Sequence, residues 1–250
     1  MKKLEFTKMQ GLGNDFVVLD GPLVLTENAV QGLCDRRYGI GADGVLVVTP
    51  GDPIVMEYWN ADGSAAEMCG NGLRCVARYA ADRGLASLPS FNIDTQVGMR
   101  RVTVGDDGIE ADLGPVSVTG HASVENVRYH LIDVGNPHAV SVVDEPEDID
   151  ISTVGPRVET DPQFPSGTNV EFAAITDDSV TMRVWERGVG ETRACGTGMA
   201  AAAMVASKLG RLEGQIAVHV PGGTGHVEFR DGRGWLTGPA EYSFTGTVEI

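Results

Sequence analysis

The sequence has little of several features that would place it in a common class of protein. No stretch approaches the roughly 20 apolar residues of a membrane-spanning helix, so we expect no membrane partner. Four cysteines in 250 residues are too few for a disulfide-stapled secreted domain. The N-terminal segment is interrupted by Glu5, Lys8 and Asn14 where a signal peptide needs an apolar core. These absences predict a cytoplasmic protein with reduced thiols.

Basic residues are also scarce. The chain has 19 Lys and Arg against 35 Asp and Glu, which gives a net charge of -16. Such a charge repels polyphosphate, so we expect no nucleic-acid partner. The hydrophobic fraction of 42% is that of an ordinary globular protein. A chain of this length can form two modest domains with buried cores.

An internal repeat organises the chain. The segment 56–72, MEYWNADGSAAEMCGNG, aligns without a gap with the segment 182–198, MRVWERGVGETRACGTG. A second pair of motifs, Gly-Asn at 13–14 and at 135–136, stands before an apolar run in each half. We therefore predict two homologous halves, residues 1–114 carrying Cys69 and residues 115–240 carrying Cys195. The C-terminal strand at about 241–250 is expected to return to the first half.

The two halves show the same pattern of secondary structure. Apolar and β-branched runs bounded by Gly, Pro and Asp predict strands at 44–49, 54–58, 101–104, 180–184 and 215–220. Segments 71–83 and 197–209 are rich in helix-forming residues, and each ends at a glycine that can cap it. Each half is thus predicted to be a set of strands with one helix, which begins at a Cys-Gly-x-Gly turn.

The position of the two cysteines favours proton chemistry. A thiol at the first turn of a helix faces unpaired backbone N–H groups and the positive end of the helix dipole. Both favour the thiolate, so we expect the pKa of Cys69 and of Cys195 to fall toward neutrality. The glycines that follow leave room for a carboxylate to approach the N–H groups. One such turn predicts an anion site with a reactive thiol.

Two such turns on two halves predict a site with an acid–base group on each wall. One thiolate can take the α-proton of an amino acid while the opposing thiol protonates the other face, which inverts the carbon. The two helix N-termini would stabilise the charge that develops on the carboxylate. Neither the glycines near Asn14 nor those after the cysteines complete a dinucleotide or phosphate-loop pattern. The spacing of Cys69 and Cys75 does not fit a zinc site, so we expect neither cofactor nor metal.

Six motifs in order along the chain resemble those of the diaminopimelate epimerase family. They are KMQGLGNDF at 8–16, GIGADG at 39–44, NADG at 60–63, MCGNGLRC at 68–75, GNPH at 135–138, and ERG with CGTG within 186–198. The resemblance implies an α+β fold of two pseudo-symmetric domains, each a curved, mostly antiparallel, barrel-like sheet around a central helix, and a homodimer. It also implies epimerisation of L,L-diaminopimelate to meso-diaminopimelate, which supplies lysine and peptidoglycan biosynthesis.

The resemblance further assigns roles to individual residues. Cys69 and Cys195 would be the acid–base pair, and His138 and Glu186 would tune their pKa values. The residues implied to hold the substrate are Asn14, Asn60, Gly70, Asn71, Asn136, Asn169, Glu186, Arg187, Gly196 and Thr197. Arg187 suits the second carboxylate of diaminopimelate, because guanidinium binds carboxylate in a bidentate manner. Some members carry a substrate-contacting Gln where this chain has Gly44.

Other readings of these residues stay open on the sequence alone. Cys34 and Cys75 are expected to be small buried hydrophobes, and a disulfide between Cys69 and Cys195 would be an oxidised, inactive form. A proline-racemase-like enzyme would use the same pair of cysteines on a smaller substrate, and Arg187 would then have no second carboxylate to bind. A phenazine-pathway-type isomerase shares the architecture but does not need paired cysteines. Outside this class, a redox-sensing or amino-acid-binding protein would not turn substrate over.

Overall fold

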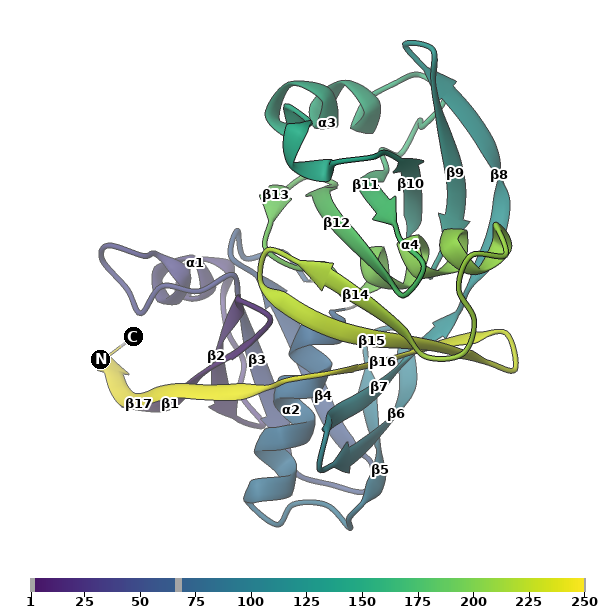
Figure 1. Cartoon of the computed structure of the whole chain (residues 1–250). Coiled ribbons are helices and arrows are strands. Elements are labelled where there is room, and N and C mark those ends of the chain that lie inside the picture. The colour runs from purple at the N-terminus through teal and green to yellow at the C-terminus, as the bar shows by residue number, and fades with distance from the viewer. Residues whose placement is uncertain (1–2, 66–68, 250) are drawn as a thin grey trace. The chain divides into compact units, whose positions relative to one another are not determined.

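The computed structural model describes residues 3–65 and 69–249 (Figure 1). Met68 of the repeat motif and Ile250 of the expected last strand lie outside the described residues. The chain divides into two compact units, Met1–Ala111 with Gly238–Ile250 (unit 1) and Asp112–Thr237 (unit 2). In the described part of the chain, no helix has the length and apolar character needed to cross a membrane.

Unit 1 is a curved sheet with two helices. Its strands are β1 (Lys3–Gly11), β2 (Asn14–Asp20), β3 (Gly44–Thr49), β4 (Ile54–Asn60), β5 (Ser90–Thr95), β6 (Gly98–Gly105), β7 (Gly108–Pro115) and β17 (Glu241–Glu249). Its helices are α1 (Glu27–Cys34) and α2 (Gly70–Asp82). The strands are bonded in the order β17-β1-β2-β3-β4-β5-β6-β7, with β2–β3 and β4–β5 parallel and the other pairs antiparallel. The C-terminal strand therefore pairs with the first strand.

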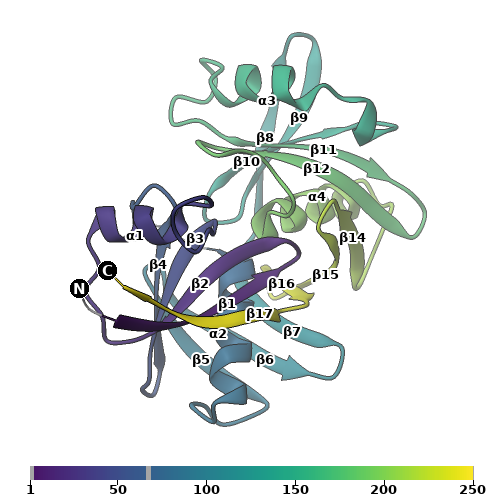
Figure 2. The same cartoon turned by 90° about the vertical axis from the view of Figure 1, so that its left-hand side faces the viewer.

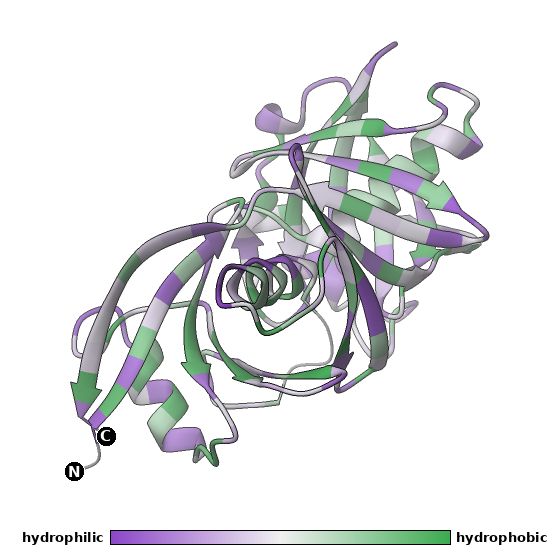
Figure 3. Ribbon diagram, turned by 90° about the horizontal axis from the view of Figure 1, so that it is seen from below, coloured by the Kyte–Doolittle hydropathy of each residue, from purple (hydrophilic) through white to green (hydrophobic). Residues whose placement is uncertain are grey.

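The two faces of this sheet bury different residues because side chains alternate along a strand. On β3, Leu46 and Val48 point into the cluster around α2, whereas Val45 and Val47 point into the cluster under α1. The strands curve around α2, which Figure 3 shows end-on, and α1 lies beside β3 on the outer face (Figure 2). α2 is thus the central helix of unit 1.

Unit 2 repeats this arrangement. Its strands are β8 (Ser117–Val124), β9 (Val127–Asp133), β10 (Pro137–Val142), β11 (Asn169–Ile175), β12 (Ser179–Glu186), β13 (Gly190–Thr192), β14 (Ile216–Val220), β15 (Gly223–Arg230) and β16 (Arg233–Gly238). Its helices are η1 (Pro146–Asp148), α3 (Ile151–Glu159) and α4 (Gly196–Lys208). The order β8-β9-β10-β11-β12-β14-β15-β16 has parallel pairs at β10–β11 and β12–β14. Parallel and antiparallel pairs follow each other as in unit 1, so the predicted pseudo-symmetric α+β fold is confirmed.

The ends of the two central helices agree with the sequence prediction. Gly84 and Gly210 follow α2 and α4 with φ of 66° and 67°. Two backbone bonds close each C-terminus, and the residue after each glycine donates to the carbonyl of Ala80 or Ala206. One prediction was incomplete, because each unit has a second, outer helix. Both α1 and α3 are short and contain glycine, so their sequences carry a weak helix signal.

The outer helices give a matched test of packing. Replacing a helical glycine by alanine ordinarily stabilises a protein by about 0.5–1 kcal/mol. At Gly155 of α3, however, an added Cβ would lie 2.5 Å from Cγ of Trp185. We expect Gly155→Ala to lower the free energy of unfolding by about 1–2 kcal/mol. Gly32→Ala in α1, where nothing lies within 4 Å of the added carbon, should raise it. Urea unfolding of both variants tests this, and shifts in the same direction would contradict the packing described for α3.

Candidate active site

Cys69 caps the N-terminus of α2. Its sulfur accepts a hydrogen bond from the N–H of Gly72 at 3.3 Å, as a serine or threonine cap does with its oxygen. The thiol donates to Oδ1 of Asn14 at 3.4 Å. Nδ2 of Asn71 donates to the same oxygen at 3.2 Å. The structure therefore brings three predicted site residues of unit 1 together at the start of its central helix.

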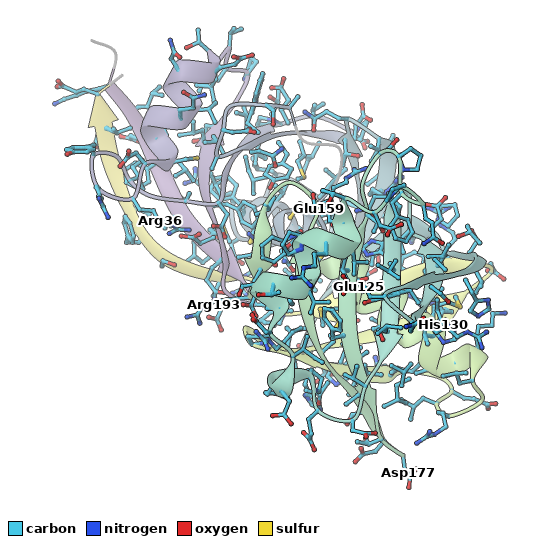
Figure 4. The ribbon with its side chains drawn as sticks, turned by 90° about the horizontal axis from the view of Figure 1, so that it is seen from above. Arg36, Glu125, His130, Glu159, Asp177 and Arg193 are labelled. Atoms are coloured by element: carbon cyan, nitrogen blue, oxygen red, sulfur yellow. The ribbon has the colours of Figure 1, made fainter. Side chains whose placement is uncertain are left out.

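The amide of Asn14 is held in one orientation by a charged cluster. Its Nδ2 donates to Asp43 at 2.7 Å, which turns Oδ1 toward Cys69. Arg36, labelled in Figure 4, bonds to Asp43 at 2.7 Å and to Asp15 at 2.6 Å. The buried ammonium of Lys8 lies 2.5 Å from Asp15 and also donates to the carbonyl of Gly41. This cluster therefore fixes the orientation of the Asn14 amide through its contact with Asp43.

Asp15 makes this cluster a pH-dependent source of stability. Burial alone would raise the pKa of Asp15, but hydrogen bonds from Arg36 and Lys8 outweigh it and lower the pKa to about 2. A carboxylate with a depressed folded-state pKa stabilises the fold above its unfolded pKa of about 4, and this is lost as the pH falls toward 2. We expect Asp15→Asn to cost about 2 kcal/mol of unfolding free energy at pH 7 and less at pH 3. A cost in urea unfolding that is no smaller at pH 3 would contradict this assignment.

Cys195 caps α4 in the same way but in a different environment. Its sulfur accepts from the N–H of Gly198 at 3.4 Å and lies 3.4 Å from the hydroxyl of Thr197. Burial and the nearby carboxylates of Glu186 and Glu171 raise the pKa of Cys195 well above its usual value. The expectation of a lowered pKa is therefore wrong for Cys195. Removal from water and the negative charge of two neighbouring carboxylates raise the pKa by more than the helix N-terminus lowers it.

Two carboxylates lie near this thiol, and one of them is paired with an imidazole. Glu186 accepts hydrogen bonds from the hydroxyl of Thr192 and from Cys195, and burial raises its pKa above the ordinary value of 4.5. Nδ1 of His138 lies 2.6 Å from Oε1 of Glu171, and neither side chain is exposed to solvent. The structure thus places Glu186 against Cys195 and pairs His138 with Glu171.

The remaining predicted residues of unit 2 lie around this group. Oδ1 of Asn136 lies 3.0 Å from Nε2 of His138, and its Nδ2 donates to Thr197 at 3.4 Å. Asn169 is the register partner of His138 on the neighbouring strand. Its side chain donates to the carbonyl of Pro137 at 2.9 Å and accepts from the backbone N–H of Arg187 at 3.0 Å. Asn169 therefore braces the segment that carries Arg187.

Other predicted positions are explained by their local contacts. Asn60, at the end of β4, bonds through its amide to Ser64 at 3.0 Å. Gly70 and Gly196 are buried at the first helical positions. At Gly44 an added Cβ would lie 2.5 Å from the carbonyl oxygen of Trp59 and 2.6 Å from the ring of Tyr58. A side chain at Gly44 would therefore require the neighbouring strand to move.

The two other cysteines are buried, as expected. Burial raises the pKa of Cys34 to about 11 and that of Cys75 to about 12, so both thiols stay neutral at physiological pH. Across residues 3–65 and 69–249, the side chains of His, Cys, Asp and Glu do not gather in threes in a way that could hold a metal ion.

Three residues near the cysteines were given no role by the sequence analysis, although two of them, Asp43 and Arg74, lie within its motifs. Arg74 is fully buried in α2, Glu171 is fully buried on β11, and Asp43 orients Asn14. Glu171 interrupts the apolar run of its strand, and a charged residue in such a run is the signal that could have identified it. Arg74 lies little more than one helical turn after Cys69, and a charged residue this close to the predicted catalytic cysteine is the signal that could have identified it.

Comparisons with known proteins agree with this architecture. The profile of the family described as Diaminopimelate epimerase matches the chain twice, over residues 6–119 and 130–243. A diaminopimelate epimerase of Desulfitobacterium hafniense is 38% identical, covering 98% of this chain and 98% of its own. One of Alkalilimnicola ehrlichii is 41% identical, covering 99% of each.

A solved structure extends the comparison to the fold. A phenazine biosynthesis protein of the PhzF family from Bacillus anthracis is 14% identical with a TM-score of 0.80, covering 100% of both chains. Identity this low shows a shared fold and no more, whereas the sequence relatives are similar over almost their whole length. The chain is therefore an epimerase and belongs to the diaminopimelate epimerase family.

Proposed function

We propose that this enzyme converts L,L-diaminopimelate to meso-diaminopimelate without a cofactor, with Cys69 and Cys195 as the acid–base pair. One observation carries the proposal: each unit places a cysteine sulfur at the cap of its central helix, in hydrogen-bond contact with a backbone N–H of the first turn. Sequence relatives named diaminopimelate epimerase support the choice of substrate.

The reaction follows from the chemistry of a weakly acidic α-carbon. In one direction, the thiolate of one cysteine takes the α-proton, and the electron pair of the broken C–H bond moves into the carboxylate. The thiol of the other cysteine then delivers its proton to the opposite face, which completes the inversion. The first sulfur ends as a thiol and the second as a thiolate. The reverse reaction uses the same two groups with their roles exchanged.

The helix N-termini supply the stabilisation that a cofactor would otherwise provide. In both turns the residues after the cysteine are Gly-x-Gly, and the N–H of the second glycine donates to the cysteine sulfur. The two N–H groups before it belong to the first turn, where helix geometry supplies no carbonyl acceptor. Directed at the substrate carboxylate, they stabilise the charge that develops as the proton leaves. Asn71 and Thr197 stand at the middle position of these turns, and their side chains already join the hydrogen-bond networks around the sulfurs.

The second amino-acid end of diaminopimelate needs its own partners. We assign its carboxylate to Arg187, whose planar guanidinium can donate two parallel hydrogen bonds. Asn14, Asn60, Asn136 and Asn169 would hold polar groups of the substrate without adding charge. We infer that the product supplies lysine and peptidoglycan biosynthesis in the cytoplasm, and that no membrane or nucleic acid takes part.

We also propose that the enzyme is a homodimer. The C-terminal strand β17 bears two exposed aromatic side chains, Tyr242 at 43% and Phe244 at 51% of full exposure. Aromatic side chains exposed on a strand at the edge of a sheet are an unfavourable arrangement that a second copy can relieve. Light scattering at micromolar concentration should give twice the mass of the chain, and the mass of one chain would contradict the dimer.

Two alternative functions make different predictions. A proline-racemase-like enzyme would act on a substrate with a single amino-acid end. A binding or redox-sensing protein would hold an amino acid without releasing its α-proton. Arg187 and the amide side chains favour a larger polar substrate over proline. The half-buried carboxylate of Glu186, which accepts a hydrogen bond from Cys195 and has a raised pKa, favours proton transfer over simple binding.

The test is an epimerisation assay with purified enzyme in reducing buffer and no added cofactor. Chiral chromatography should show L,L-diaminopimelate converting to the meso isomer and the meso isomer converting back. L-Proline should remain unchanged in the parallel reaction. Racemisation of proline would favour the first alternative, and binding of diaminopimelate without isomerisation would favour the second.

A further inference from the structure

Arg74 is a buried cation that the proposed reaction does not yet use. It lies in the second turn of α2 with 0% of its surface exposed. Its guanidinium donates to the carbonyl oxygen of Gly70 at 3.3 Å, to Oδ1 of Asn71 at 2.7 Å and to the carbonyl of Pro239 at 3.3 Å. All three acceptors are neutral. Within the described residues Arg74 forms no ion pair.

A buried guanidinium without a carboxylate partner is costly. Burial lowers the pKa of Arg74, because removal from water penalises the charged form. Arginine nevertheless keeps its proton in proteins, so the positive charge remains. Three neutral acceptors satisfy N–H groups but do not balance the charge. The thiolate form of a nearby cysteine would balance it.

The repeat shows where this charge matters. Ala200 occupies the position of α4 that corresponds to Arg74, so unit 2 has no cation at this point of its helix. On the sheet behind the start of the helix, the charged residue is in unit 2 and the apolar residue is in unit 1. Leu46 lies 3.2 Å from the ideal Cβ of Gly72, whereas Glu171 lies 2.8 Å from that of Gly198.

The sheet residue next to this position differs between the units in the same way. Phe16 pairs with Gly44 in unit 1, and His138 pairs with Asn169 in unit 2. Each unit thus has an ionisable side chain behind its cysteine. In unit 1 this is Arg74 on the central helix, and in unit 2 these are His138 and Glu171 on the sheet.

The described groups around Cys69 other than Arg74 are neutral or already paired, so Arg74 is the cation placed to balance a thiolate there. Asn14 and Gly72 contact the sulfur and are neutral. Asp43 stands behind Asn14 and is paired with Arg36. The Cys75 thiol is neutral because burial raises its pKa to about 12. The charge of Arg74 acts on the thiolate form of Cys69 and hardly at all on the neutral thiol, so it favours ionisation.

Arg74 also controls the geometry around the sulfur. It donates to Oδ1 of Asn71, which leaves Nδ2 of Asn71 to donate to Asn14. Oδ1 of Asn14 in turn accepts from the Cys69 thiol. A change at Arg74 would therefore release both amides that surround the thiol.

We propose that Arg74 is a positioning residue that supplies the buried counter-charge for the Cys69 thiolate and orients the Asn71 and Asn14 amides around it. Its part in turnover rests on the proposed function. Its effect on the ionisation of Cys69 does not, so it can be measured on the free enzyme. A failed epimerisation assay and a failed counter-charge test are therefore distinguishable.

The test measures the rate of iodoacetamide labelling at Cys69 against pH in the full-length protein, with the labelled peptide quantified by mass spectrometry. Only the thiolate reacts, so the midpoint of the profile reports ionisation. Arg74→Gln should move this midpoint upward by about one pH unit. Arg74→Lys, which keeps the positive charge, should leave the midpoint close to that of the wild type. Arg78→Gln is the matched control, since Arg78 is on the same helix but exposed and paired with Asp82. It should leave the midpoint unchanged.

The outcomes separate a counter-charge from a structural brace. A lower melting temperature for both Arg74 variants, with the Cys69 midpoint unmoved, would overturn the proposal. If Arg74→Gln does not fold, the pH dependence of stability in the wild type and Cys69→Ala decides. A counter-charged Cys69 ionises at lower pH in the folded than in the unfolded protein. The wild type should then gain unfolding free energy over Cys69→Ala as the pH rises from about 7 to 9. No gain would also overturn the proposal.

Discussion

Replacing either Cys69 or Cys195 by alanine should reduce epimerase turnover by at least about 1000-fold and leave the fold intact. Inversion needs a base on one face of the carbon and an acid on the other, so removal of either sulfur removes one of the two proton transfers. The helix cap is lost as well, which costs about 1 kcal/mol. Kinetic assay in both directions, with circular dichroism and thermal melting, measures both effects.

Cys34→Ala is the control for this pair. Cys34 is a buried thiol at the last residue of α1 in unit 1 and belongs to the core on the outer face of the sheet. Its replacement should lower the melting temperature by a few degrees and leave turnover within about twofold of the wild type. Normal turnover by Cys69→Ala or Cys195→Ala would contradict the roles proposed for the two thiols.

Replacing Glu186 by glutamine should lower kcat by about 100-fold, the second largest effect. The carboxylate accepts a hydrogen bond from Cys195, and burial raises its pKa above that of an exposed glutamate. Glu186 is therefore placed to receive the proton of Cys195 when this cysteine must act as a base. The glutamine variant keeps the shape of the side chain and loses this capacity.

The pH profile distinguishes this role from a structural one. Because the pKa of Glu186 is raised, the carboxyl gains its proton at a higher pH than an ordinary glutamate, and activity should fall as the pH drops through that range. The acidic limb should be absent in Glu186→Gln. Glu191→Gln is the control, since Glu191 on β13 is paired with Arg183. A wild-type acidic limb in Glu186→Gln would show that another group governs the profile.

Much of the fold could be predicted because the repeated segments contain the residues that begin and end its central helices. The Cys-Gly-x-Gly turns and the capping glycines locate both central helices to within a residue, since caps are determined by the residues at the helix ends. The strand Gly44–Thr49 was predicted with its observed bounds. The outer helices were missed because their stability comes from packing on the sheet. Trp185 against Gly155 is such a contact, and it joins residues distant in sequence.

The electrostatics of the candidate site could not be predicted in this way. The helix-terminus argument treats Cys69 and Cys195 alike, since both cap a helix through the same turn. The two sites differ in the side chains on the sheet: the parallel pairing of β10 and β11, which β2 and β3 repeat in unit 1, brings Glu171 beside His138. That pairing depends on a long-range strand register, which local sequence does not determine. Burial is the largest cause of the raised pKa of Cys195, followed by the nearby carboxylates of Glu186 and Glu171.

The central claim is that two separate groups transfer protons on opposite faces of one carbon, and isotope incorporation tests it most directly. L,L-Diaminopimelate is incubated with the enzyme in D₂O, and the reaction is stopped at low conversion. The account predicts that the meso product carries deuterium at the inverted α-carbon while the recovered L,L substrate carries none. Meso product that retains the original hydrogen would show a single group acting on both faces, and the two-cysteine account would then be wrong.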